Sequence, residues 1–245
     1  MRTFLILLII GSANFFSAQN LLTPSNVKLD SKHIQDESNE VSWTMENAGK
    51  KIEIGKITTE QKKLNKKELL IKTTVKMKQT PEAWVDSTIV KISDFQPVYH
   101  SSFNSMRNMS LKFDKNKVTG YYLDKKTQKK DIINEAVTAA YFDSNSYPAM
   151  IRFLPLKENY SAEISIFDYN PTAKKGVINA YIEKVEIGEY NGKKVWIVKT
   201  TDDIQDRKTE STYYIDLDSR KVIKQEINAG GRKMIMEDIQ QFGNQ

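Results

Sequence analysis

The sequence contains no cysteine and only two histidines, His33 and His100. Without cysteine the chain forms no disulfide, no thiolate metal site and no lipid-modified cysteine of the kind that anchors bacterial lipoproteins. The two histidines are far apart in sequence, so they do not form the i, i+4 pair of a helical zinc site. The stability of the protein must therefore come from a packed hydrophobic core.

The sequence also lacks the short motifs of common catalytic sites. His100 precedes two serines, but no GxSxG turn of a serine hydrolase is present. The acidic residues within 202–206 (DDIQD) do not follow the spacing of a calcium loop. We therefore predict that the protein is not an enzyme, that it has no catalytic residues, and that it uses no cofactor and no metal.

Long hydrophobic runs are rare, and one of them opens the chain. Apolar residues 4–10 follow the basic Arg2 and precede the small residues Ser17 and Ala18. This pattern is typical of a cleaved secretory signal, so we predict that residues 1–18 are removed and that the protein is exported, to the periplasm or beyond the cell. Polar residues interrupt the run before it reaches the roughly 20 apolar residues of a membrane-spanning helix, so we expect no stable membrane insertion.

Positive charge is in slight excess, with 37 Lys and Arg against 31 Asp and Glu and a net charge of +6. The basic residues are mostly lysines in doublets, and several of these doublets fall at predicted turns and strand ends. A nucleic-acid surface would gather arginines and stacking aromatics on one face, so we predict that nucleic acid is not a partner. Scattered lysines instead favour solubility and protect the edges of a sheet.

Polar and apolar residues alternate through most of the chain, which predicts β-strands. In LLIKTTVKMK, residues 69–78, every second side chain is apolar or Thr, as in a half-buried strand. Similar runs occur at 51–57, 84–92, 109–113 and 118–124. We predict that a polar N-terminal segment, residues 19–40, is followed by a strand-rich half at 41–130.

Three tight turns divide the second half, residues 160–241, into a succession of strands. They are Asn191-Gly192, Asp218-Ser219 and Gly230-Gly231. Asn-Gly is a strong hairpin signal, because both central residues of the turn need positive φ. Sequential antiparallel pairing is the simplest topology for these strands.

The periodicity changes between the two halves, at residues 131–155. A first helix is predicted from an N-cap at Asp131 through Tyr141, and a second one from an N-cap at Ser146 to Pro155. The second helix lies in YFDSNSYPAMIRFLPL, residues 141–156, and is apolar on nearly every side, so we expect it to be buried.

These observations predict a mainly β protein with a single domain at 41–245. Its core would be a curved antiparallel sheet or incomplete barrel of about 10 to 12 strands in meander order. The helical plug at 131–155 would fill the concave face of this sheet. The pattern leaves open whether the two runs of strands form one sheet or two.

The segments 139–168, 188–200 and 211–227 resemble an uncharacterised family of secreted and periplasmic bacterial proteins, a domain of unknown function. The sheets of that family resemble the lipoprotein-carrier fold. The resemblance implies an incomplete barrel around a helix, with an apolar interior that holds acyl chains in the carriers. The end of the signal segment and the composition also look like those of a Bacteroidetes exported protein.

Aromatic side chains on the predicted strands either pack in the core or line an amphipathic pocket with the plug as its floor. The candidate pocket residues are Met150, Ile151, Phe153, Leu154, Trp84, Tyr122, Trp196 and Tyr213. The leading hypothesis is a non-enzymatic protein that binds a lipid or other apolar ligand on its concave face, as a carrier or sensor. The alternative is a structural or protein-interaction module of the cell envelope whose core is filled by its own helix. A cavity of at least about 300 Å³ would favour the first.

Overall fold

The structure of the protein is a computed structural model that describes residues 21–47, 49–171 and 176–239. The predicted signal peptide, residues 1–18, lies outside this part of the chain.

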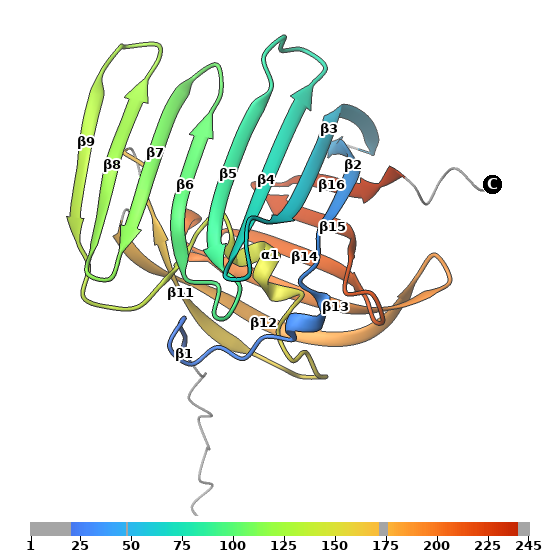
Figure 1. Cartoon of the computed structure of the whole chain (residues 1–245). Coiled ribbons are helices and arrows are strands. Elements are labelled where there is room, and N and C mark those ends of the chain that lie inside the picture. The colour runs from blue at the N-terminus through green and yellow to red at the C-terminus, as the bar shows by residue number, and fades with distance from the viewer. Residues whose placement is uncertain (1–20, 48, 172–175, 240–245) are drawn as a thin grey trace, which may run out of the picture.

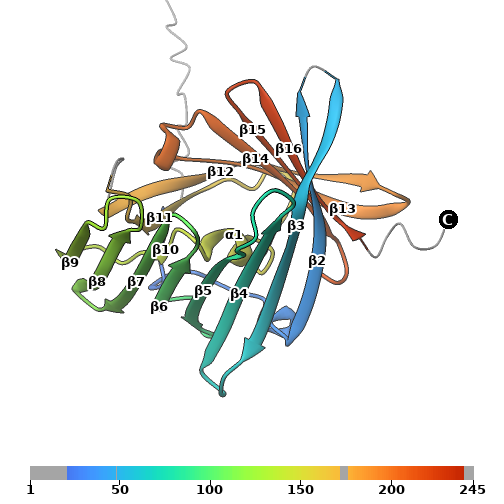
Figure 2. The ribbon, with the colours of Figure 1, turned by 90° about the horizontal axis from the view of Figure 1, so that it is seen from above.

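All sixteen strands of the described residues belong to one sheet, which curves without closing into a barrel (Figures 1 and 2). The first run of strands contains β2 (Glu37–Asn47), β3 (Lys50–Lys63), β4 (Glu68–Met77), β5 (Trp84–Lys91), β6 (Pro97–Phe103), β7 (Arg107–Asp114), β8 (Lys117–Asp124) and β9 (Lys130–Ala136). The second run contains β11 (Ala162–Asp168), β12 (Gly176–Tyr190), β13 (Lys193–Asp202), β14 (Thr209–Asp216), β15 (Val222–Ala229) and β16 (Arg232–Asp238). Two short strands, β1 (Leu21–Leu22) and β10 (Phe142–Asp143), pair in parallel with β11. The predicted open β architecture in meander order is confirmed, with more strands than predicted.

The two runs form a single sheet because the last strand of the second run pairs with the first strand of the first run. β16 lies antiparallel to β2, with Met236 opposite Trp43. Within each run, neighbouring strands pair in sequence order. β2, the first long strand, and β16, the last strand of the described chain, therefore lie side by side within the sheet.

The predicted hairpin turns have the backbone conformation that their residues favour. Asn191 and Gly192 have φ values of 50° and 73°, and Gly230 and Gly231 have values of 55° and 78°. Positive φ at both central residues matches the twist of the flanking strands. The Asn-Gly and Gly-Gly hairpins are confirmed.

The first predicted helix, from Asp131 to Tyr141, is wrong. Residues 130–136 form strand β9, which pairs with β8. The side chain of Ile133 is buried there, whereas its neighbour Ile132 is 73% exposed. This alternation satisfies the strand period, and the hydrogen bonds to β8 outweigh the local helical pattern.

The second predicted helix is present as α1 (Tyr147–Ile151), which begins after Ser146 and has Pro148 in its first turn. α1 and the turn that follows it lie inside the curve of the sheet (Figure 2). The side chains of Met150, Ile151, Phe153 and Leu154 are fully buried there, between strands of both runs. No helix within residues 21–47, 49–171 and 176–239 has both the length and the hydropathy to cross a membrane.

The segment before β2 packs against this plug. Its 3-10 helix η1 (Ser31–His33) precedes Ile34, which is 1% exposed in the same core. The backbone N–H of Asp30 donates to the carbonyl of Phe153 over 2.8 Å. The residues between β1 and β2 thus cover the end of the plug, and the first run of strands begins with β2 at Glu37.

Replacing Phe153 by Ala should lower the free energy of unfolding by about 3 to 5 kcal/mol, because a cavity replaces a buried ring. The centroid of this ring lies 5.8 Å from that of Phe95. Urea unfolding measures the loss. The control, Ile132→Ala on the exposed side of β9, should change stability by no more than about 0.5 kcal/mol. Similar small losses in both variants would contradict the buried position of the plug.

Candidate functional site

Two cavities lie on the concave face of the sheet and share Asn145 as a wall residue. The α1 cavity, of about 280 Å³, lies between α1 and strands β2, β3, β4, β14, β15 and β16. The His100 cavity, of about 310 Å³, lies over β5, β6 and β7. The two are adjacent, because Thr73 in the wall of the first is the cross-strand partner of Asp86 in the wall of the second.

The wall of the α1 cavity is built by residues that strand register places on one face. Val41 lies opposite Ile57, and Gln61 lies opposite Ile71. The apolar part of the wall consists of Val41, Ile57, Ile71, Pro148, Ala149, Val222 and Met236. The polar part includes Glu37, Asn39, Thr59, Gln61, Thr73, Asn145, Arg152, Tyr213, Lys221 and Gln225. The cavity is therefore amphipathic.

Two buried side chains in this wall have polar atoms without a partner. Arg152 and Gln61 are each 5% exposed. Nε of Arg152 and Oε1 of Gln61 make no hydrogen bond within the described chain. The guanidinium of Arg152 does form an ion pair with Glu37 through Nη2. Burial lowers the pKa of Arg152, and the charge and hydrogen bond of Glu37 oppose the shift.

The wall of the His100 cavity is polar because the inward positions of β5 and β6 are polar. Asp86 lies opposite Ser102, and Thr88 lies opposite His100. All four side chains are buried. In β7 the corresponding residues are the apolar Met109 and Leu111, which lie opposite Ser102 and His100.

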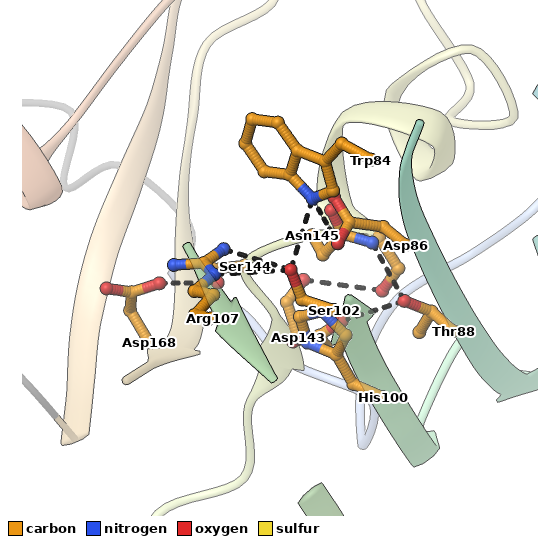
Figure 3. Close-up of polar contacts among 11 residues, drawn as sticks. Trp84, Asp86, Thr88, His100, Ser102, Arg107, Asp143, Ser144, Asn145 and Asp168 are labelled. Atoms are coloured by element: carbon orange, nitrogen blue, oxygen red, sulfur yellow. Dashed lines mark hydrogen bonds and ion pairs between the residues drawn. The ribbon is translucent and has the colours of Figure 1, made fainter. Parts of the chain in front are cut away.

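Asp143 in β10 connects these strands to the plug (Figure 3). Its carboxylate is 1% exposed. One oxygen lies 3.1 Å from Nδ1 of His100, and the other accepts a hydrogen bond from the hydroxyl of Thr88 over 3.2 Å. Asn145 also donates to the hydroxyl of Thr88 over 3.0 Å. The turn before α1 is therefore fixed to β5 and β6 by polar contacts.

The imidazole of His100 is buried and has one unpartnered nitrogen. Burial lowers the pKa of His100, but the charge and hydrogen bond of Asp143, helped by the charge of Asp86, outweigh burial and raise it above 6.5. Nε2 makes no hydrogen bond within the described chain. A buried imidazole whose Nε2 has no partner can donate to a molecule in the cavity when the ring is protonated, and can accept from one when Nε2 carries no hydrogen.

A second group of side chains converges on Ser102 (Figure 3). Nε1 of Trp84 donates to Asp86 over 2.8 Å and to the hydroxyl of Ser102 over 3.1 Å. The guanidinium of Arg107 donates to the same hydroxyl over 3.1 and 3.3 Å and lies 5.6 Å from the Trp84 ring. Within the described chain, Arg107 forms no ion pair with a carboxylate.

Asp168 in β11 completes the wall on the side of the second run. Its carboxylate accepts a hydrogen bond from the hydroxyl of Ser144 over 2.7 Å. Burial raises the pKa of Asp168, and the charge of Asp143 adds to the effect, while the Ser144 hydrogen bond opposes it. Three carboxylates, one arginine and one histidine thus border the His100 cavity.

The eight candidate pocket residues lie in three different environments. The plug residues Met150, Ile151, Phe153 and Leu154 are core and line neither cavity. Trp84 lines the His100 cavity, and Tyr213 lines the α1 cavity. Tyr122 packs beside the smaller core cluster, next to Tyr169, and Trp196 packs against the main core. Whether any of the eight binds a ligand stays a prediction.

Sequence reasoning missed Arg152, Gln61, Asp143 and Arg107. A signal for two of them is present, because Asp143 and Arg152 are the charged residues of the apolar segment 141–156. A charge in a segment that must be buried needs a partner, so it indicates an ion pair or a site. Gln61 and Arg107 carry no such signal.

Comparisons with known proteins identify a family and a fold. Residues 38–237 match the family described as "Protein of unknown function (DUF3108)". Among solved structures, the chain is similar to the β-barrel-like protein of domain of unknown function DUF1849 from Brucella abortus, with a TM-score of 0.52 and 10% sequence identity. The similarity covers 84% of this chain and 96% of the other, and at this identity it shows a shared fold alone. No curated protein matches the chain.

The ion pair of His100 with Asp143 should make stability depend on pH. Because the pKa of His100 is higher in the folded state than the ordinary 6.5, its stabilisation is complete below pH 6.5 and is lost as pH rises through the folded pKa. The free energy of unfolding of the wild type, minus that of His100→Gln, should therefore fall as the pH rises above the ordinary His pKa of 6.5. Urea unfolding at several pH values measures this difference, and the contribution of His33 cancels because both proteins contain it. A difference that rises with pH would contradict the ion pair.

Proposed function

Because the chain belongs to the DUF3108 family of proteins of unknown function, its activity must be inferred from its own geometry, and we propose that it binds an apolar molecule with a polar group in the α1 cavity. It acts as a carrier or sensor and not as an enzyme. From the signal-like residues 1–18 we further propose that it works after export, in the periplasm.

One observation carries the proposal: buried, unpartnered polar atoms lie in a largely apolar wall. Among residues 21–47, 49–171 and 176–239, nothing forms a hydrogen bond with Nε of Arg152 or Oε1 of Gln61, although both side chains are only 5% exposed. An unpaired buried polar group costs about 1 to 3 kcal/mol. A ligand that pairs these atoms removes that cost, whereas a core that served stability alone would have little reason to keep them.

The ion pair of Arg152 with Glu37 sets the chemistry of the bound polar group. Since Glu37 already balances the charge of the guanidinium, the ligand need not be an acid. A carbonyl or hydroxyl oxygen can accept from Nε of Arg152, and a hydroxyl or amide can donate to Gln61. The apolar residues Ile57 and Ile71 then contact the hydrocarbon part of the ligand.

The resemblance to a family with lipoprotein-carrier-like sheets agrees with an apolar ligand and itself remains a prediction. The competing function is an envelope interaction module without a ligand. The complete burial of Met150 and Phe153 favours that alternative, because these side chains fill the core themselves. The α1 cavity, at about 280 Å³, is also slightly smaller than the roughly 300 Å³ expected of a ligand site, so its volume alone does not favour a carrier. The two functions differ in whether anything enters this cavity.

Ala149→Met should block binding, because Ala149 lines the α1 cavity and the longer side chain fills it. Native mass spectrometry of the protein purified from the periplasm should show an adduct of lipid size on the wild type. The fluorescence of the apolar probe N-phenyl-1-naphthylamine should rise with the wild type, and Ala149→Met should weaken its binding by about tenfold or more.

The matched control is Ala136→Met, on the exposed side of β9, which should leave binding unchanged. Thermal unfolding of both variants should show that the fold is retained. A wild type that is free of adduct and does not bind the probe would overturn the proposal and favour the interaction module.

A further inference from the structure

The His100 cavity has features that the proposed apolar ligand leaves unused. It is as large as the α1 cavity and shares Asn145 with it, but its wall is dominated by polar and charged side chains. His100 in this wall is 5% exposed, and its Nε2 has no partner within the described chain. This combination of a cavity and an unpartnered buried nitrogen indicates a second binding subsite.

The register of the sheet makes the two cavities parts of one surface. Ile71 and Thr73 in β4 line the α1 cavity, and their partners in β5 are Thr88 and Asp86. Asp86 lines the His100 cavity. The hydroxyl of Thr88 accepts a hydrogen bond from Asn145, which lines both cavities. The concave face therefore changes from apolar to polar between two adjacent strands. A ligand that extends past Asn145 would contact apolar side chains in the α1 cavity and hydrogen-bonding groups in the His100 cavity.

We infer that the His100 cavity binds the head group of the ligand whose apolar part occupies the α1 cavity, and that this head group is an uncharged, hydroxyl-rich one such as a sugar or a glycerol. The inference rests on the proposed function, since it assigns the polar end of the same ligand.

The charges of the wall exclude an anionic head group. Asp86, Asp143 and Asp168 border the cavity, against Arg107 and His100. The wall is thus negative or close to neutral, and a phosphate or carboxylate would lie next to three carboxylates. Such like-charge contacts oppose binding.

A cationic head group also fits poorly. Asp143 is already occupied by His100 and Thr88, and Asp168 accepts from Ser144. The guanidinium of Arg107 lies by the Trp84 ring, where an ammonium group would otherwise pack. A cationic head group would therefore lie close to the positive charge of Arg107 at the Trp84 ring.

Hydroxyl groups of a ligand match the hydrogen-bond donors and acceptors in the wall of the His100 cavity. A hydroxyl both donates and accepts, so it pairs with Nε2 of His100 in either protonation state of the ring. Carboxylates such as Asp86 and Asp168 accept from further hydroxyls, and Arg107 donates to a ring or ether oxygen. The face of Trp84 gives an apolar contact for the carbon skeleton of a sugar.

The experiment compares four ligands that have the same decyl chain and different head groups. They are decyl β-D-glucoside, decanoate, decyltrimethylammonium and decyl triethylene glycol ether, each measured below its micelle concentration by displacement of N-phenyl-1-naphthylamine. Each net hydrogen bond contributes about threefold to tenfold in affinity, so the glucoside should bind about tenfold or more tightly than the other three.

Two variants locate the preference in the His100 cavity. Arg107→Gln removes the donor, and Asp86→Asn keeps an acceptor for Trp84 while removing a carboxylate. Both should weaken binding of the glucoside and reduce its preference over the other three ligands to within about threefold. Arg232→Gln, at an exposed arginine of β16, is the control and should keep the preference. Near-UV circular dichroism should show that each variant is folded.

The outcomes separate this inference from the proposed function. Equal affinity for all four ligands, or a preference for decanoate or decyltrimethylammonium, would overturn the head-group assignment while the α1 cavity remains a ligand site. A preference that persists in both Arg107→Gln and Asp86→Asn would also overturn it. If no decyl compound binds the wild type, the proposed function fails and the inference fails with it.

Discussion

The structure depends on filling the concave face of a sheet that curves but does not close. Residues 141–156 do this, and Asp143 holds them in place. Both oxygens of its buried carboxylate are used, by Thr88 and by His100 of the first run of strands. Its backbone pairs beside Phe167 of β11, in the second run. A carboxylate this deeply buried is tolerated only when it is well paired. Asp143 therefore connects the plug to the first run through its side chain and to the second run through its backbone.

The shortness of the plug explains why cavities remain. α1 has five residues, of which Tyr147, Met150 and Ile151 are buried in the core. Ala149 and Arg152, the residue that follows the helix, line the α1 cavity. The side chains on the strands that line each cavity determine which kind of ligand that cavity can hold. Ile57 and Ile71 give the α1 cavity an apolar side, and the inward positions of β5 and β6 give the His100 cavity a polar one. The wall chemistry of the two cavities follows from which strand each lies over, because alternation fixes one side chain in two on the concave face.

The sequence predicts the strands well and the segment before the plug poorly, for a physical reason. Period-two alternation and the turn at Asn191-Gly192 are local signals, and strand pairing only reinforces them. At 131–141 the local signal is ambiguous, because residues such as Ile133 and Val137, four apart, share one face of a helix and also one face of a strand. The deciding interaction is pairing with β8. The join of β16 to β2, which makes one sheet out of two runs, involves residues about 190 positions apart and has no local signature.

The candidate site follows from a distinction that sequence alone cannot draw, between buried polar groups that are fully paired and those that are not. Asp143 and Arg152 look alike in the sequence, each a charge in an apolar segment. In the structure Asp143 has partners on both oxygens, so stability explains it. Within the part of the chain that the structure describes, Arg152 leaves Nε of its guanidinium unpaired, and His100 leaves Nε2 unpaired. A half-paired buried group weakens a core. Two such groups, each lining one of two adjacent cavities, are better explained by a ligand that completes their hydrogen bonds than by packing.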